Sequence, residues 1–95
     1  MGKLRESARG RECQVRIHPF CNHDPTTVVL AHMNGGGMGM KKPNIHASFC
    51  CSGCHDVVDG RKNTSYTSGD LKRYFYEGIF RTQQIWLDEG LITTK

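Results

Sequence analysis

The chain has 95 residues, of which 37% are hydrophobic and eleven are glycine, so it can form one small core and has no room for a second. Its formal net charge of +4 is compatible with a polyanionic partner, and no apolar run approaches the roughly 20 residues of a membrane span. No charged and then apolar leader is visible before the first cysteine, so we expect a reducing cytoplasm, where clustered cysteines more often bind zinc than form disulfides.

The first half of the chain predicts a short basic helix followed by a hairpin. Residues 3–11 combine helix formers with basic side chains and predict an N-terminal helix within residues 1–12. Residues 26–33 are β-branched and apolar and predict a strand, and residues 44–50 predict a second one. The glycine-rich, basic segment 34–43 between them is expected to be an extended loop.

The second half predicts two helices. Residues 55–61 form a short helix that ends at Gly60, and a longer helix runs from residue 68 to about residue 89 with Ser68 as its N-cap. Apolar side chains of the longer helix recur every three or four residues, which is more typical of a packed face than of a surface that stacks on bases. These residues are Leu71, Tyr74, Phe75, Ile79 and Trp86, with Thr82 and Gln83 alongside.

The cysteines predict a structural zinc site. Cys51 and Cys54 form a Cys-x-x-Cys pair, which presents two thiolates from one turn, and Cys13 and Cys21 supply two more. Four thiolates saturate the metal, so any chemistry would lie elsewhere. The competing interpretation is a set of unrelated free thiols, but the spacing of the first pair and the number of the second favour zinc.

Several residues near these cysteines have two interpretations. Cys50 could replace Cys51 as a ligand, or it could pack as an apolar strand residue. His18 and His23 could substitute for Cys13, although loop histidines beside prolines are more common. His46 occupies a predicted strand position and is more typical of a half-buried polar residue than of a ligand.

A second group of residues could hold a divalent cation. His55 and Asp59 are four residues apart and share one face of the predicted helix, so an imidazole and a carboxylate could bind one ion whose other ligands are water and phosphate oxygen. His32 ends the first predicted strand and could face that ion. Each residue also has a purely structural interpretation. His32 could be an ordinary histidine at a strand end, His55 could form a hydrogen bond to a thiolate, and Asp59 could be a solvated helix carboxylate.

The order of these residues resembles a known superfamily. LAHMN at residues 30–34, then Asn44, then CSGCHDVVD at residues 51–59 is similar to the motif of the HNH (ββα-metal, His-Me finger) endonucleases. The preceding segment GMGMKKPN is similar to small phage and prophage nuclease-like proteins of unassigned function. The resemblance covers residues 13–61, with the C-terminal helix in residues 62–95 outside it. It implies one α+β domain over residues 1–95: a zinc-stapled ββα-metal core with a C-terminal packing helix.

The resemblance also implies an activity and roles for the residues. The activity is metal-dependent hydrolysis of DNA phosphodiester bonds, in phage or prophage DNA processing or recombination within the bacterial cytoplasm. His32 would be the general base, Asn44 would orient His32 or brace the hairpin, and His55 with Asp59 would hold Mg²⁺ or Mn²⁺. Where many superfamily members carry Asp or His before the base, this chain has Ala31.

Basic residues are expected to contact the DNA backbone without reading its sequence. They are Arg5, Arg9, Arg11, Lys41, Lys42, Arg61 and Lys62.

Two rival functions use the same residues. A non-catalytic zinc module would bind nucleic acid or a protein partner, and Ala31 favours it. A redox or zinc-storage protein would use the Cys-x-x-Cys pair, but it gives the basic charge and the ordered histidines no role. The last helix also presents Tyr76 and Phe80, which could serve a homodimer.

Overall fold

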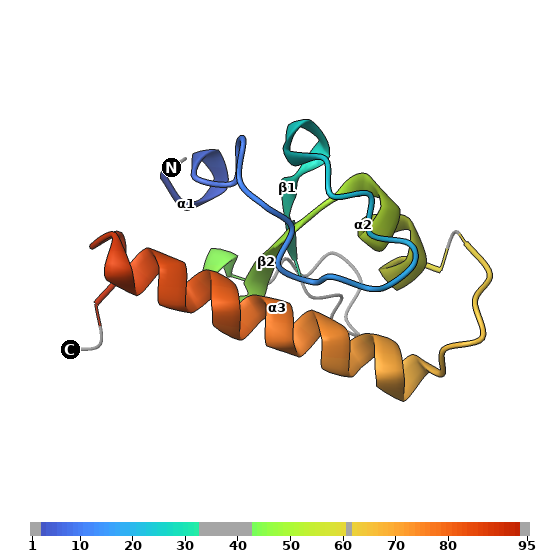
Figure 1. Ribbon diagram of the computed structural model, residues 1–95. Coiled ribbons are helices and arrows are strands. Elements are labelled where there is room, and N and C mark those ends of the chain that lie inside the picture. The colour runs from blue at the N-terminus through green and yellow to red at the C-terminus, as the bar shows by residue number, and fades with distance from the viewer. Residues whose placement is uncertain (1–2, 33–42, 61, 94–95) are drawn as a thin grey trace.

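The computed structural model describes residues 3–32, 43–60 and 62–93 and shows a two-layer α+β fold. A long helix, α3 (Ser68–Asp88), forms one layer, and a two-stranded sheet with the shorter helices lies on one side of it (Figure 1). The strands are β1 (Val29–His32) and β2 (Ala47–Cys50), and the shorter helices are α1 (Lys3–Glu6) and α2 (Ser52–Val58). The predicted α+β class is confirmed.

The hairpin is shorter than the strands predicted over residues 26–33 and 44–50. A 3-10 turn, η1 (Pro25–Thr27), precedes β1 because Asp24 Oδ1 accepts a hydrogen bond from the Thr26 amide at 3.0 Å. A second 3-10 turn, η2 (Asn44–His46), precedes β2, so the prediction of a strand position for His46 is wrong. The strands pair antiparallel with His32 opposite Ala47. The predicted loop over residues 34–43 lies almost entirely outside the described residues.

The N-cap of α3 lies one residue earlier than predicted. Thr67, not Ser68, is the N-cap: its hydroxyl accepts from the Asp70 amide at 3.0 Å, and the Asp70 carboxylate accepts from the Thr67 amide at 3.2 Å. This reciprocal pair is a capping box, which satisfies two backbone donors at once. α2 begins earlier than predicted, at Ser52 instead of residue 55, because Cys51 already caps it.

The core lies where α3 packs on β2. A Cβ atom added at Gly78 would be 2.6 Å from Ser48 Oγ, so only glycine permits this close approach. The buried Thr82 hydroxyl accepts from the Phe49 amide at 3.1 Å, which satisfies a donor on the free edge of β2. Trp86 is fully buried and meets the Phe49 ring edge-on, with ring centroids 5.9 Å apart. The predicted apolar face of the last helix is confirmed.

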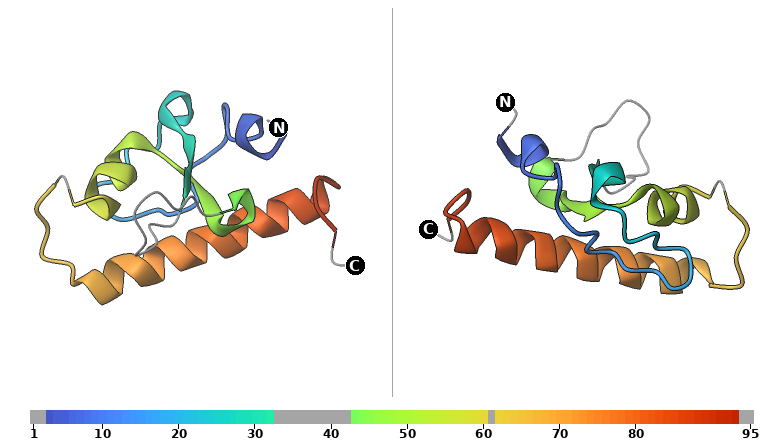
Figure 2. Two further views of the ribbon diagram at one scale, coloured as in Figure 1. Left: turned by 180° about the vertical axis from the view of Figure 1, so that it is seen from behind. Right: turned by 45° about the horizontal axis from the view of Figure 1, so that its top comes forward.

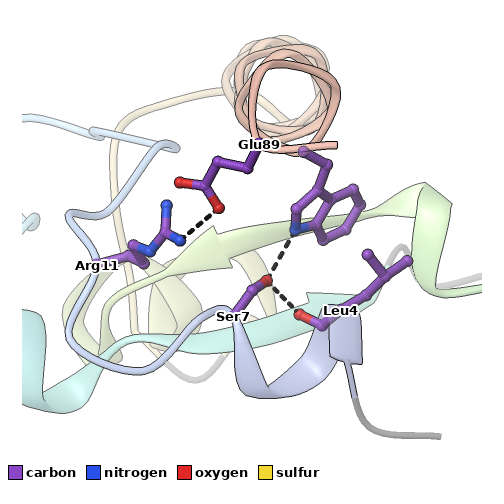
Figure 3. Close-up of polar contacts among 5 residues, drawn as sticks. Leu4, Ser7, Arg11 and Glu89 are labelled. Atoms are coloured by element: carbon purple, nitrogen blue, oxygen red, sulfur yellow. Dashed lines mark hydrogen bonds and ion pairs between the residues drawn. The ribbon is translucent and has the colours of Figure 1, made fainter. Parts of the chain in front are cut away.

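The N-terminal segment is fastened to the C-terminal half of α3. The Trp86 indole N–H donates to Ser7 Oγ at 2.8 Å, and Ser7 in turn donates to a backbone carbonyl of α1 (Figure 3). Arg11 and Glu89 form an ion pair at 2.6 Å in the same region. Both views in Figure 2 agree that α1 lies beside this end of α3. α1 itself is shorter than the helix predicted over residues 3–11.

Within the described ranges, no helix combines the length and the apolarity that crossing a bilayer requires.

Candidate metal centre and candidate active site

Four buried cysteine sulfurs form a compact cluster: Cys13, Cys21, Cys51 and Cys54 lie with all Sγ atoms within 4.8 Å of one another. The Cys13–Cys54 and Cys21–Cys51 sulfur distances are 3.7 Å and 3.8 Å. Tetrahedral zinc with Zn–S bonds of about 2.3 Å requires sulfurs about 3.8 Å apart, whereas a disulfide requires about 2.05 Å. The four predicted cysteines therefore could hold a zinc ion.

The start of α2 explains why these residues present their sulfurs together. Cys51 is the N-cap, and its Sγ accepts from the Cys54 amide at 3.4 Å, while the Ile17 amide donates to Cys54 Sγ at 3.3 Å. Backbone N–H groups at a helix N-terminus favour thiolates. A Cβ atom at Gly53 would lie 2.1 Å from the Phe20 carbonyl oxygen. Glycine at position 53 therefore lets the Phe20 backbone approach the start of α2 this closely. We did not predict this role, although the glycine inside the Cys-x-x-Cys pair is visible in the sequence.

The pKa values of the cluster thiols should make metal binding depend on pH. Burial is the largest cause that raises the pKa of Cys21, to about 11. Hydrogen bonds with the side chains of Cys50 and Cys54 hold the pKa of Cys13 far below its usual range, and the hydrogen bond with Cys13 raises the pKa of Cys54. A raised pKa means that the thiols of Cys21 and Cys54 must each lose a proton when they bind a metal ion. A dication replaces those protons, so zinc affinity should rise with pH.

Cys50 and the nearby histidines lie outside the group of four. Cys50 is fully buried in β2, and its sulfur is not among the four that lie close together, so Cys51 and not Cys50 completes the cluster. The Nδ1 atom of His23 is 3.8 Å from Cys21 Sγ, a contact to the outside of the cluster. The side chain of His18 is exposed, and its backbone carbonyl accepts from the Tyr66 hydroxyl.

The hairpin brings together a second set of predicted residues. His32 at the end of β1 and Asn44 at the start of η2 are joined by a 2.6 Å contact between Nε2 and Oδ1. An amide oxygen can only accept, so Nε2 donates, and an imidazole that is neutral in this arrangement has its lone pair on Nδ1. Asn44 therefore sets the tautomer and the orientation of His32, which is half-buried.

α2 presents the remaining pair. His55 Nε2 and Asp59 Oδ2 are 3.4 Å apart on one helix face, and both side chains are partly exposed, as the spacing of four residues predicts. Two neighbouring ligands of one octahedral Mg²⁺ at about 2.1 Å would lie about 3.0 Å apart, so this pair fits a shared cation. Among the described residues, the cysteines form the group of three or more close ligating atoms, so His32, His55 and Asp59 do not meet in a second one.

The predicted basic residues fall into three classes. Arg5 and Arg9 line a groove of about 370 Å³ whose other wall includes the start of β1. Arg11 is already paired with Glu89, and its guanidinium lies 5.8 Å from the centroid of the Phe49 ring. Lys62 is exposed. The predictions for Lys41, Lys42 and Arg61 lie outside the described residues.

Comparison with known proteins places this fold in a family. A family described as "Putative nuclease YbcO" matches residues 2–91. The chain belongs to the YbcO family. It is 48% identical over 95 residues to "Putative nuclease YbcO" of Escherichia coli (strain K12), covering 97% of this chain and 98% of the relative. The same values describe its similarity to "Putative nuclease ybcO" of Enterobacteria phage 82.

A solved structure shares the fold. It is described as "Structure of a putative bacteriophage protein from Escherichia coli str. K-12 substr. MG1655" and matches with a TM-score of 0.80 and 48% sequence identity. The match covers 93% of this chain and 100% of that one. The predicted resemblance to phage and prophage nuclease-like proteins is confirmed at the level of the YbcO family, whose members carry a nuclease name.

Proposed function

We propose that this YbcO chain is a metal-dependent DNA endonuclease of the HNH type that acts in phage or prophage DNA processing. The observation that carries the proposal is the 2.6 Å contact between His32 and Asn44 at the end of β1, in a chain whose next helix presents His55 and Asp59. The nuclease name of relatives at 48% identity supports the activity class. All five cysteines are free thiols, which suits the reducing cytoplasm that we propose for it.

His32 would act as the general base. Because Asn44 accepts from Nε2, the Nδ1 lone pair is available to take a proton from water. The hydroxide oxygen then attacks phosphorus in line, a new P–O bond forms, and the bond to the leaving oxygen breaks. A neutral imidazole suits this step near neutral pH.

His55 and Asp59 would hold Mg²⁺ or Mn²⁺ beside the scissile phosphate. A bound dication supplies charge stabilisation to the phosphate and the leaving oxygen. Ala31, at the position where a further ligand would be expected, is buried and offers no donor. Water and phosphate oxygens would therefore complete the coordination, so the site would form fully only with substrate.

The arginine groove gives the DNA backbone a path along the hairpin. Arg5 and Arg9 lie beside the first residues of β1, and His32 ends the same strand. If DNA phosphates bound these guanidinium groups, the next phosphates along the DNA backbone would lie near His32. Such contacts position the duplex without reading bases and weaken as salt rises. We assign Arg11 a structural role and not a contact with DNA, because Glu89 already neutralises its charge.

The proposal is tested by plasmid nicking with Mg²⁺, Mn²⁺ and Zn²⁺. We expect His32→Ala to lose cleavage with unchanged zinc content and unchanged circular dichroism. The matched control is His18→Ala, which removes an exposed imidazole outside both sites. Cleavage that survives in His32→Ala would contradict the mechanism.

A second candidate is a non-catalytic zinc module that binds nucleic acid. The buried Ala31 favours it, as does the separation of the histidine pairs. It predicts DNA binding that falls steeply with salt and depends on Arg5 and Arg9, with no cleavage for any divalent ion. The nicking assay on the wild-type chain distinguishes the two functions directly.

A further inference from the structure

α3 carries an apolar patch on the face turned away from the core. Phe80 is 67% exposed, Tyr76 is 41% exposed, and Ile45 of η2 is 39% exposed. They adjoin a groove of about 410 Å³ between α3 and η2. Large apolar side chains that gather on one surface mark an interaction site more often than scattered ones do. The groove is lined by His46, Tyr76, Ile79, Phe80 and Gln83.

The patch places an exposed aromatic ring beside a groove with apolar walls. Phe80 is the most exposed large apolar residue of the described chain, and the groove beside it has mainly apolar walls. The Gln83 side chain donates to the Ile45 carbonyl at 2.6 Å and holds η2 against α3, so this wall of the groove is fixed. A ring and a groove side by side on one chain are self-complementary under a two-fold axis.

The charges on the same helix indicate which orientation a second copy would take. Arg73 is seven residues before Phe80 and Asp88 is eight after it, and both are exposed. Within the described residues, Arg73 has no hydrogen bond or ion pair, and Asp88 accepts only from the neutral Gln84 side chain. Two antiparallel copies of α3 crossing near Phe80 would place Arg73 opposite the partner's Asp88 at both ends, whereas parallel copies would oppose like charges.

We infer that this chain forms a two-fold homodimer through antiparallel α3 helices, with each Phe80 seated in the partner's groove. A standard interface covers about 800 Å² per partner, which is roughly one eighth of the 6298 Å² that the chain exposes. α3 has 21 residues and is therefore about 31 Å long, and η2 lies beside it. The residues that carry the inference, Phe80, Arg73 and Asp88, have no role in the proposed cleavage, so it stands or falls separately from the nuclease proposal.

Sedimentation equilibrium of the zinc-loaded full chain, from about 1 μM to about 1 mM, tests the dimer. We expect a reversible dimer in the wild type and an increase in Kd of at least about 30-fold in Phe80→Glu, the effect of losing a central anchor. Because Phe80 is exposed, the variant should keep its zinc and its helix content. The matched control is Leu91→Glu, an exposed apolar residue outside the groove, which should dimerise like the wild type.

A charge-reversal cycle tests the antiparallel arrangement. Arg73→Glu and Asp88→Arg should each raise Kd about fivefold, since each opposes like charges at both ends of the dimer, and the double variant should restore the wild-type value. A wild type that stays monomeric throughout the concentration range would overturn the dimer. A dimer insensitive to Phe80→Glu, or a double variant that is not restored, would overturn the proposed interface.

Discussion

The cysteine cluster and the histidine residues differ in how far the folded chain completes each site by itself. Four sulfurs meet at spacings that match tetrahedral zinc. The histidine residues form two separate pairs, His32 with Asn44 and His55 with Asp59. A structural metal is saturated by the protein, whereas a catalytic cation keeps positions for water and phosphate. Changes in the cluster should therefore alter stability, and changes in the histidine pairs should alter cleavage.

The largest effect is expected from loss of a cluster ligand. Cys54→Ser should abolish zinc binding and cooperative folding, because a structural zinc site contributes about 10–16 kcal/mol, comparable to the entire stability of a domain. Bound metal and a thermal melt followed by circular dichroism measure both effects. The matched control is Cys50→Ser, which changes a buried thiol outside the group of four and should retain zinc. A zinc-loaded Cys54→Ser variant that melts cooperatively would contradict the prediction.

A smaller loss of stability is expected from a change at Gly53, where the start of α2 lies close to the Phe20 backbone. Gly53→Ala places a Cβ atom 2.1 Å from the Phe20 carbonyl oxygen, so the loop must move away from the cluster. We expect the free energy of unfolding to fall by at least about 1–3 kcal/mol and zinc to bind more weakly. Denaturant unfolding at fixed zinc measures the change.

Gly69→Ala provides the matched control for Gly53→Ala. Its Cβ atom would meet its nearest neighbour at 3.8 Å, an ordinary contact, within the first turn of α3. Replacing a helical glycine there should leave stability unchanged or raise it by up to about 1 kcal/mol. Equal losses in the two variants would show that the close approach at Gly53 has no special cost.

Variants of Asn44 test the role that we propose for its contact with His32. Asn44→Ala removes the acceptor for His32 Nε2, so we expect cleavage to fall about 10–100-fold while stability changes by less than about 1 kcal/mol. Asn44→Asp keeps an acceptor and adds a negative charge, which would favour the protonated form of the imidazole beside it. It should recover part of the activity and shift the acid limb of the pH–rate profile to higher pH. An unshifted profile would count against Asn44 as the residue that positions His32.

The smallest effect concerns the ion pair that joins the N-terminal segment to α3. The Arg11 guanidinium, mainly through its hydrogen bond, lowers the pKa of Glu89 from its usual 4.5. A carboxylate with a lowered pKa contributes stability above that value, and the contribution is lost as pH falls through the folded-state pKa. Melting midpoints of wild type and Glu89→Gln should therefore differ slightly at neutral pH and converge below about pH 4.5. A constant difference at all pH values would exclude the pair as its cause.

Local patterns in the sequence were sufficient for the buried face of α3, for the close cysteine pair and for the histidine–aspartate pair on α2. The three- and four-residue spacing of Phe75, Ile79 and Trp86 predicted the buried face of α3, because helix geometry alone determines which side chains share a face. The pair Cys51 and Cys54 predicted a metal knuckle for the same reason, since one turn sets the distance between them. The pairing of His55 with Asp59 also followed from helix spacing.

Tertiary structure decided every feature that depends on residues distant in the chain. Spacing left Cys50 and Cys51 as alternatives, and only the folded chain shows that Cys51 belongs to the group of four close sulfurs. Arg16 and His23 adopt positive φ angles of 58° and 55°. Such angles are uncommon in residues other than glycine, so the residue types at these positions did not predict them. Arg11, one of several basic residues in the sequence, is paired because α3 carries Glu89 to it. A group of cysteines able to bind a metal ion could thus be predicted from their number and spacing, whereas the choice among the five thiols and among the basic residues required the packing of the loops and α3.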